Sequence, residues 1–331
     1  MQSLRVAWFI AVALTVLLTC GAAVARSVTL FVGPEGKAAN SGLSEKDPLP
    51  DLASAWTRAL AGKEPVTAVE IRVLPGTYLG QHLALTDRSG GRPDLVITRH
   101  QDETRPVFDG QGEDLTWLTV APSSRGGVRI FGLTVTRYLT AISLNGSRTD
   151  LGRSISGVVI RNNIFSVIGQ QSPKQARSST AAVRLVNADG VQIVNNRFVD
   201  IENREGCGLI HAIYLAHDST GNLVKGNLFE DSCGDPVRFR DGSGLNVVED
   251  NTFKDAWSSA PISDWYCDST RRDDCSKRSP ECPSFGNRLV GNKMIVERAK
   301  KPEATVAYGS DQAASCPVPP PAAERQRFLS R

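Results

Sequence analysis

The chain has 331 residues, of which 29 are glycine and only 6% are aromatic, and its formal net charge is +3. A chain this close to neutral lacks the basic excess of a nucleic-acid-binding protein, so no nucleic-acid partner is expected. Abundant glycine with few aromatic residues is typical of short stacked strands joined by tight turns.

The first 25 residues predict a secretory signal peptide. They carry one positive charge at Arg5 and an apolar run from Val6 to Leu18, and they end in a small-residue cleavage site at Ala25. An uncleaved anchor, or a lipoprotein signal ending at Cys20, is the alternative. We therefore expect a secreted or periplasmic protein that has no membrane contact after cleavage.

Residues 26–310 predict one domain, and residues 311–331 predict a disordered Pro-rich tail. The domain begins with an expected strand at Val28–Val32 and a polar loop that leads to Asp47-Pro48. One helical stripe follows, formed by Leu52, Ala55, Trp56, Ala59 and Leu60. A short amphipathic helix at this place would cover the open end of a stack of strands.

Short strands without a helical stripe fill the next part of the chain. They are expected at Val69–Val73, Leu95–Thr98, Trp117–Val120 and Val128–Phe131. The turn Leu74-Pro-Gly-Thr-Tyr78 follows the first of them. This opening resembles that of the right-handed parallel β-helix proteins of the pectin-lyase-like type, and the resemblance covers residues 28–300.

The resemblance implies an all-β fold, a single-stranded right-handed parallel β-helix with a short N-terminal capping helix. A repeated phrase supports a solenoid, because an alternating Val/Ile pattern closes on asparagine five times, at intervals of 24–41 residues. Its asparagines are Asn163, Asn196, Asn227, Asn251 and Asn292. We expect about eight coils, with these asparagines stacked in one turn and the phenylalanines that follow the first four of them stacked inside. Neither set is expected to be a functional site.

Six cysteines remain after the predicted signal peptide: Cys207, Cys233, Cys267, Cys275, Cys282 and Cys316. An even number in an exported chain predicts three disulfides, and the lack of a Cys-x-x-Cys pair argues against zinc. Cys207 and Cys233 each precede the strand of adjacent coils, so we expect a bridge between them. The other four would then pair among themselves.

Three strands before clear repeats indicate which side chains face outward. They are Ala182–Val186, Ala212–Ala216 and Pro236–Arg240. If their alternate apolar residues point inward, alternation turns Arg184, Tyr214 and Arg238 outward. Stacked coils lie about 4.8 Å apart, so these three side chains should form one row, with Arg240 in the next row.

Such a strip suits an extended anionic ligand that contains rings. Guanidinium groups bind carboxylates in bidentate fashion, and a tyrosine can contact a sugar. We therefore predict Arg184, Arg238 and the neighbouring Asp235 as substrate-binding residues. The alternative is that the arginines are ordinary solvated side chains on a sheet face.

Two of the four histidines, His211 and His217, flank the middle strand, and histidine is the usual candidate for a general base. Asp218 could orient the imidazole of His217. The alternative is a turn histidine that bonds a backbone carbonyl. Three acids near this face (Asp218, Asp235 and Asp241) could bind calcium, but scattered acids usually face solvent in turns, so no cofactor is expected.

Residues 218–242 resemble the active segment of the chondroitinase B/alginate lyase family. Ser219 and Asn222 match the Lys-Ser-x-x-Asn motif of that family, and Phe239-Arg240 with Gly242 matches its Phe-Arg-His-Gly motif. The resemblance implies that Arg240 takes the position of the catalytic arginine.

Two positions depart from the family pattern. Asp218 stands in place of the lysine base, and Asp241 stands in place of the histidine. Arginine stays protonated under ordinary conditions, so the base must be His217, His211 or Tyr214.

The resemblance implies a monomeric lyase that binds and cleaves an acidic, uronate-containing polysaccharide by β-elimination. A non-catalytic β-helix that binds cell-wall or matrix glycans is the first alternative, favoured by the missing lysine. A glycoside hydrolase or epimerase on the same scaffold is the second, although no paired-aspartate pattern was found in the sequence.

Overall fold

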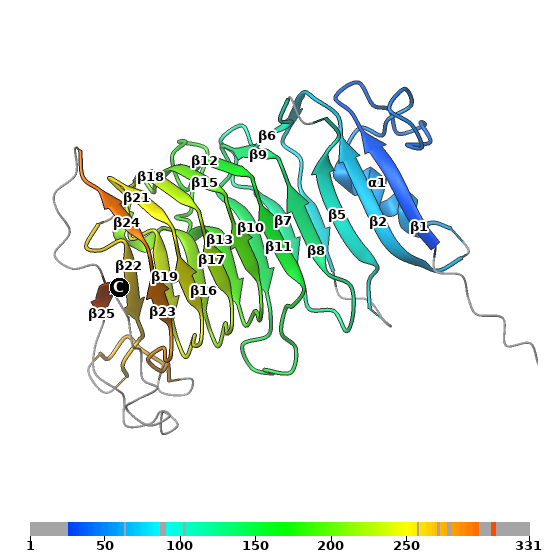
Figure 1. Cartoon of the computed structure of the whole chain (residues 1–331). Helices are drawn as coiled ribbons and strands as arrows, with labels where there is room; N and C mark the ends of the chain where they lie inside the picture. The colour runs from blue at the N-terminus through cyan, green and yellow to red at the C-terminus, as the bar shows by residue number, and fades with distance from the viewer. Residues whose placement is uncertain are drawn as a thin grey trace, which may run out of the picture.

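The structure is a computed structural model that describes residues 26–297 and 306–308, apart from 63, 87–90, 102–103, 257, 270–271 and 277–279. The predicted signal peptide, the predicted tail and Cys316 lie outside the described residues. The described residues form one elongated solenoid (Figure 1).

Three parallel sheets run along the solenoid. The first contains, in neighbouring order, β1 (Arg26–Val32), β2 (Val66–Val73), β5 (Asp94–Arg99), β8 (Val128–Phe131), β11 (Val158–Arg161), β14 (Gln192–Val194), β17 (Leu223–Lys225), β20 (Val247–Glu249) and β23 (Arg288–Val290). The second contains β3 (Thr77–Leu79), β6 (Val107–Asp109), β9 (Thr134–Thr136), β12 (Ile164–Ile168), β15 (Arg197–Ile201), β18 (Leu228–Ser232), β21 (Thr252–Lys254) and β24 (Lys293–Ile295). The third contains β4 (Leu83–Leu85), β7 (Thr116–Val120), β10 (Thr140–Asn145), β13 (Ala181–Val186), β16 (His211–Ala216), β19 (Val237–Arg240), β22 (Ile262–Trp265) and β25 (Val306–Tyr308).

Each strand pairs in parallel with the equivalent strands of the coils before and after it, as β13, β16 and β19 do. This arrangement confirms the predicted parallel β-helix. Without β1, the first sheet has eight strands, as the other two sheets do. This number agrees with the expected number of coils.

The N-terminal end of the core is covered by α1 (Leu52–Leu60), as the apolar stripe predicts. Asp51 caps this helix by accepting a 2.6 Å hydrogen bond from the Ser54 N–H. Leu52, Ala55 and Trp56 are buried, and the helix packs against β1 and β2. No helix in the described part of the chain is long and apolar enough to cross a membrane.

The interior is built from two kinds of stack. Phe165, Phe198, Phe229 and Phe253 are buried, with consecutive ring centroids 4.9–5.1 Å apart. Beside them the predicted asparagine ladder is present, for example where the Asn196 Nδ2 donates to Asn227 Oδ1 at 3.1 Å. Both stacks confirm the structural interpretation of the repeats.

A second ladder was not predicted. Asn222 Nδ2 donates to Asn246 Oδ1 at 2.9 Å, and Asn246 Nδ2 donates to Asn287 Oδ1 at 2.9 Å. Ser219 lies beside this ladder and is completely buried. The two residues that match the Ser and Asn of the lyase motif, Ser219 and Asn222, therefore serve the scaffold.

Two disulfides join described cysteines. Cys207 and Cys233 are bonded with Cα atoms 5.4 Å apart, which confirms the predicted bridge. Cys267 is bonded to Cys275. The pairing predicted for Cys316 stays a prediction.

Candidate functional site

The predicted row of outward side chains is present on the third sheet. Arg184 lies opposite Tyr214, and Tyr214 lies opposite Arg238, on the adjacent strands β13, β16 and β19. The row continues at each end with a serine, Ser143 on β10 and Ser263 on β22. The register assigned from alternation is therefore correct.

Arg240 lies in the next row, opposite Trp265 of β22. The guanidinium carbon of Arg240 lies 4.5 Å from the centroid of the Trp265 ring, which is a cation–π contact. Trp265 is half-buried whereas Tyr214 is buried, so Trp265 is the more exposed of the two aromatic rings. Trp265 was not predicted, because its strand lies one coil beyond the three strands from which the outward rows were assigned.

Arg184 differs from the other arginines of this face because no described carboxylate lies within ion-pair distance of it. Its guanidinium donates to the amide oxygen of Asn145 at 3.1 Å and approaches the Ser143 hydroxyl at 3.5 Å. Burial, together with the nearby Arg148, lowers the pKa of Arg184. A partly desolvated cation with only neutral partners attracts an anionic ligand.

In Arg240, in contrast, each of the three guanidinium nitrogens has a hydrogen-bond partner. Its Nε and one terminal nitrogen each donate to the Glu281 carboxylate at 2.7 Å, and its other terminal nitrogen donates to the Tyr214 hydroxyl at 3.2 Å. Burial alone would lower the pKa of Arg240, but the Glu281 carboxylate raises it above its usual value.

Glu281 was not predicted, and it comes from the Cys-rich part of the chain that follows β22. Its carboxylate also accepts a 2.8 Å bond from the Cys267 N–H, and the residue is 7% exposed. The next residue, Cys282, also contacts this site, because its N–H donates to Asp241 at 3.0 Å.

Tyr214 is 6% exposed and lies between the arginines. Burial raises the pKa of Tyr214, and the charge of Arg240 opposes that change only in part. The phenol therefore stays protonated at neutral pH. Since its oxygen accepts a bond from Arg240, its own hydrogen remains available for a ligand oxygen. The geometry favours Tyr214 as a proton donor over the predicted role as a base.

His217 follows directly after β16 and forms a pair with an acid of the next coil. Its Nδ1 lies 2.6 Å from Asp241 Oδ2, and its Nε2 has no hydrogen-bond partner among the described residues. Asp241, rather than the expected Asp218, orients this imidazole. Register explains the difference, because Ala216 lies opposite Arg240 and the residues after them face each other across the coils.

His211 is less suited to the base role predicted for it. Its Nδ1 lies 2.7 Å from the Asp235 carbonyl oxygen, and its ring stacks on Tyr214 with centroids 5.6 Å apart. Burial, reinforced by the charge of Arg238, lowers the pKa of His211 to about 3. An imidazole with so low a proton affinity is a weak base at neutral pH.

Asp235 and Arg238, both predicted to bind substrate, make several contacts within the protein. Asp235 Oδ1 accepts from the N–H groups of three consecutive residues, including Ser259 at 2.8 Å and Ala260 at 3.1 Å, while Arg238 donates to Oδ2 at 3.2 Å. Burial alone would raise the pKa of Asp235, but these donors hold it below its usual value. Arg238 also donates to the Ser263 hydroxyl at 2.6 Å.

His217, Asp241 and Glu281 each offer a metal-ligand atom, and these atoms lie within 4.8 Å of one another. A cation at this place would have to break the His217–Asp241 bond and compete with Arg240 for Glu281. The three residues are therefore able to meet around an ion only after their present contacts rearrange.

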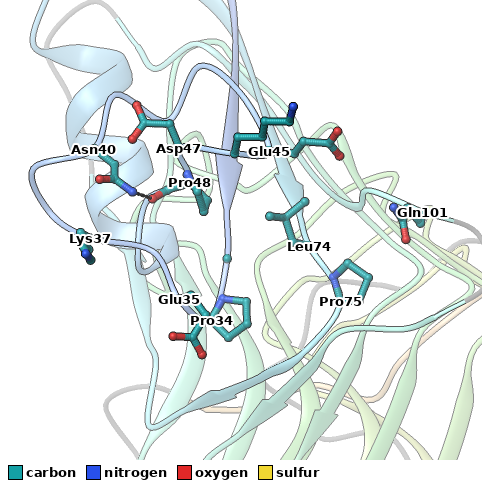
Figure 2. A pocket seen from close by; sticks show the side chains of 12 residues that line it. Pro34, Glu35, Lys37, Asn40, Glu45, Asp47, Pro48, Leu74, Pro75 and Gln101 are labelled. Carbon is teal, nitrogen blue, oxygen red and sulfur yellow. Dashed lines mark hydrogen bonds between the residues drawn. The ribbon is translucent and has the colours of Figure 1, made fainter.

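A separate hollow of about 780 Å³ lies at the N-terminal end of the solenoid, beside the loop that follows β1 (Figure 2). Its acids include Glu35, Glu45 and Asp47. A hydrogen bond from the Ser41 hydroxyl lowers the pKa of Asp47, so the negative charge persists. Lys37 and Lys46 also line the hollow, so its charges are mixed. The strands that carry the arginine face lie toward the other end of the solenoid (Figure 1).

Neither a protein-family model nor a curated protein matches the sequence. Among solved structures, an alginate lyase from Paenibacillus sp. str. FPU-7 matches with a TM-score of 0.51 and 12% identity, over 86% of this chain and 98% of that one. A pectate lyase, Pel9A, matches with a TM-score of 0.45 and 12% identity, over 86% and 68% of the two chains. A rhamnogalacturonan lyase matches with a TM-score of 0.41 and 14% identity, over 85% of this chain and 66% of that one, slightly less than two thirds of its length. At these identities the alginate lyase match shows the fold alone, which is the parallel β-helix found in polysaccharide lyases.

Proposed function

We propose that the third-sheet face binds an acidic polysaccharide and cleaves it by β-elimination at a uronate. The observation that carries this proposal is one connected network on that face. Tyr214 bonds Arg240, and Arg240 bonds Glu281, whose carboxylate lies within 4.8 Å of the His217–Asp241 pair. Beside this network lies Arg184, the arginine of the face that has no described carboxylate partner.

Elimination needs three groups, and the face offers a residue for each. A base removes the proton beside the carboxylate, a cation stabilises the charge that develops there, and a donor protonates the leaving oxygen. If the neutral imidazole of His217 carries its proton on Nδ1 and donates a hydrogen bond to Asp241, its Nε2 has no proton and is able to act as the base. Tyr214 is the donor, and an arginine neutralises the uronate carboxylate.

Arg184 holds the polysaccharide at a neighbouring uronate. A fork-shaped guanidinium that lacks a carboxylate partner binds such a group with two hydrogen bonds. Alternate coils then present Tyr214 and Trp265 to sugar rings. Support from the alginate lyase match is limited to the shared fold.

Substitutions separate binding from chemistry. His217→Gln should abolish turnover and leave the affinity for a uronate polymer within a few-fold of wild type. Arg184→Gln should weaken binding by about tenfold or more. Arg129→Gln, at an exposed arginine on the first sheet, should change neither and is the matched control. The proposal fails if His217→Gln retains full turnover.

A non-catalytic glycan-binding protein is the second candidate, favoured by the contact between Arg240 and Glu281. A permanently occupied arginine would leave Arg184 and the aromatic rings to bind sugars without cleaving them. A hydrolase is disfavoured, because it needs one protonated carboxyl group. Asp241 and Glu281 are both engaged within the protein, since Asp241 accepts from the Cys282 N–H and Glu281 from Arg240 and the Cys267 N–H.

We also propose that the protein is exported. Disulfides are typical of proteins that fold in oxidising compartments, and two are formed here. N-terminal sequencing of the secreted protein should find Arg26 as the first residue. Full-length protein retained in the cytosol would contradict this expectation.

A further inference from the structure

We propose that Glu281 is a built-in competitor that occupies the substrate-carboxylate position at Arg240, so that the site is autoinhibited until a polymer displaces it. The inference rests on the proposed function and adds the regulation of that site. Glu281 belongs to residues 281–285, which we call the Glu281 segment. This segment precedes β23 and is not part of any strand.

The contact between Arg240 and Glu281 has the geometry expected for a bound substrate. Two nitrogens of the guanidinium face the two carboxylate oxygens, each at 2.7 Å. This is the parallel, two-bond geometry with which arginine recognises carboxylate ligands. While Glu281 remains, a uronate carboxylate cannot make this two-bond contact with Arg240, and the third nitrogen already donates to Tyr214.

The Glu281 segment lies directly over the candidate catalytic groups. Its next residue, Cys282, bonds Asp241 through its N–H at 3.0 Å and accepts from the Gly242 N–H at 2.8 Å. Asp241 is the acid that orients His217. The segment therefore reaches the arginine, and through Asp241 the proposed base, at once.

Cys282 anchors the segment, because it is disulfide-bonded. Hydrogen bonds add to this anchor, among them a 2.8 Å bond from the Ser284 hydroxyl to Asp264 and a 2.8 Å bond from the Leu245 N–H to the Phe285 carbonyl. Displacement therefore means that the Glu281 side chain turns away from Arg240 and from the Cys267 N–H while Cys282 stays in place. This movement breaks no strand pairing.

Arg184 explains how a polymer could displace Glu281 where a single sugar could not. Arg184 lies two coils before Arg240 and binds one uronate first, since it has no competing carboxylate among the described residues. A second uronate of the same chain is then held near Arg240 at a high effective concentration. Polymers should bind well and single uronates poorly.

The test compares wild type with Glu281→Gln, which keeps the shape and removes the charge. Glu281→Gln should bind a single uronate and a short oligouronate about tenfold or more tightly than wild type, and the preference for longer chains should shrink. Glu230→Gln is the matched control, because Glu230 bonds Arg197 at 2.6 Å on the second sheet. Its affinities should equal those of wild type.

Glu281→Asp is the second variant, and it tests the competitor role of Glu281 if Glu281→Gln does not fold. Aspartate keeps the charge but is too short to reach both guanidinium nitrogens in the same way, so affinity for single uronates should rise by a smaller factor. If wild type binds polymers and neither variant binds single uronates more tightly, this inference is overturned and the proposed function stands. If no protein binds any uronate ligand, both are overturned.

Discussion

The asparagine ladder makes a quantitative prediction for Asn227→Ala. The Asn227 side chain makes four hydrogen bonds: it accepts from the N–H and Nδ2 of Asn196 at 2.9 and 3.1 Å, and it donates to Ile193 O and Asn251 Oδ1 at 2.8 and 3.0 Å. Alanine removes all four. The residue is 1% exposed, so water cannot replace the lost partners without a rearrangement.

The cost follows from these contacts. Each hydrogen bond contributes about 1 kcal/mol net, and a buried donor left without any partner costs about 1–3 kcal/mol. The Asn196 N–H is such a donor, whereas the Asn196 amide keeps its 2.9 Å bond to Ile160 O. We therefore expect the free energy of unfolding to fall by about 3–5 kcal/mol.

Urea unfolding followed by circular dichroism measures this change. The matched control is Asn195→Gly, because Asn195 is exposed and its φ of 54° is one that glycine adopts without strain. The control should stay within about 0.5 kcal/mol of wild type. Equal stability of Asn227→Ala and this control would refute the interpretation of the ladder as a source of stability.

Three further predictions concern single features. Tyr214→Phe keeps the ring and should lower turnover about 100-fold or more with little change in affinity; an unchanged kcat on a uronate polymer would remove Tyr214 from the proton-donor role. Because burial lowers the pKa of His211 to about 3, the unfolded chain takes up a proton there that the folded chain does not. The stability from neutral His211 is thus complete above about pH 6.5 and is lost toward pH 3 at about 1.4 kcal/mol per pH unit; denaturation curves of His211→Gln should lack this component, and identical pH slopes would contradict the assignment. Replacing Cys207 and Cys233 by serine opens a bridge that spans 26 residues and should cost about 3 kcal/mol, and an unchanged denaturation midpoint would show that the bridge does not stabilise the fold.

The fold and the row of outward side chains were predictable because both follow from short-range periodicity. The repeated phrase places Asn196 and Asn227 at equivalent turns, and two-residue alternation then orients Arg184 and Tyr214. His211 shows the limit of alternation. Two consecutive residues, Ala212 and Ile213, belong to the core at the start of β16, which interrupts the two-residue alternation. Because of this interruption, His211 lies on the outer face and stacks on Tyr214.

The partners of the site residues could not be predicted, because they come from parts of the chain without the repeat. Glu281 lies 41 residues after Arg240, in a segment whose path depends on tertiary packing and disulfides. No spacing rule connects the two residues. Asp241 was visible as a departure from the lyase motif, and the register of β16 with β19 would have placed it opposite His217.

The most direct test of the central claim is the ultraviolet absorbance of unsaturated uronate products. Wild type, His217→Gln and Glu281→Gln would be incubated with alginate, pectate and glycosaminoglycans. Absorbance should rise with wild type on at least one of these polymers, should rise with Glu281→Gln, and should stay flat with His217→Gln. New reducing ends without this absorbance, or no change with any polymer and any variant, would contradict cleavage by β-elimination at the arginine face.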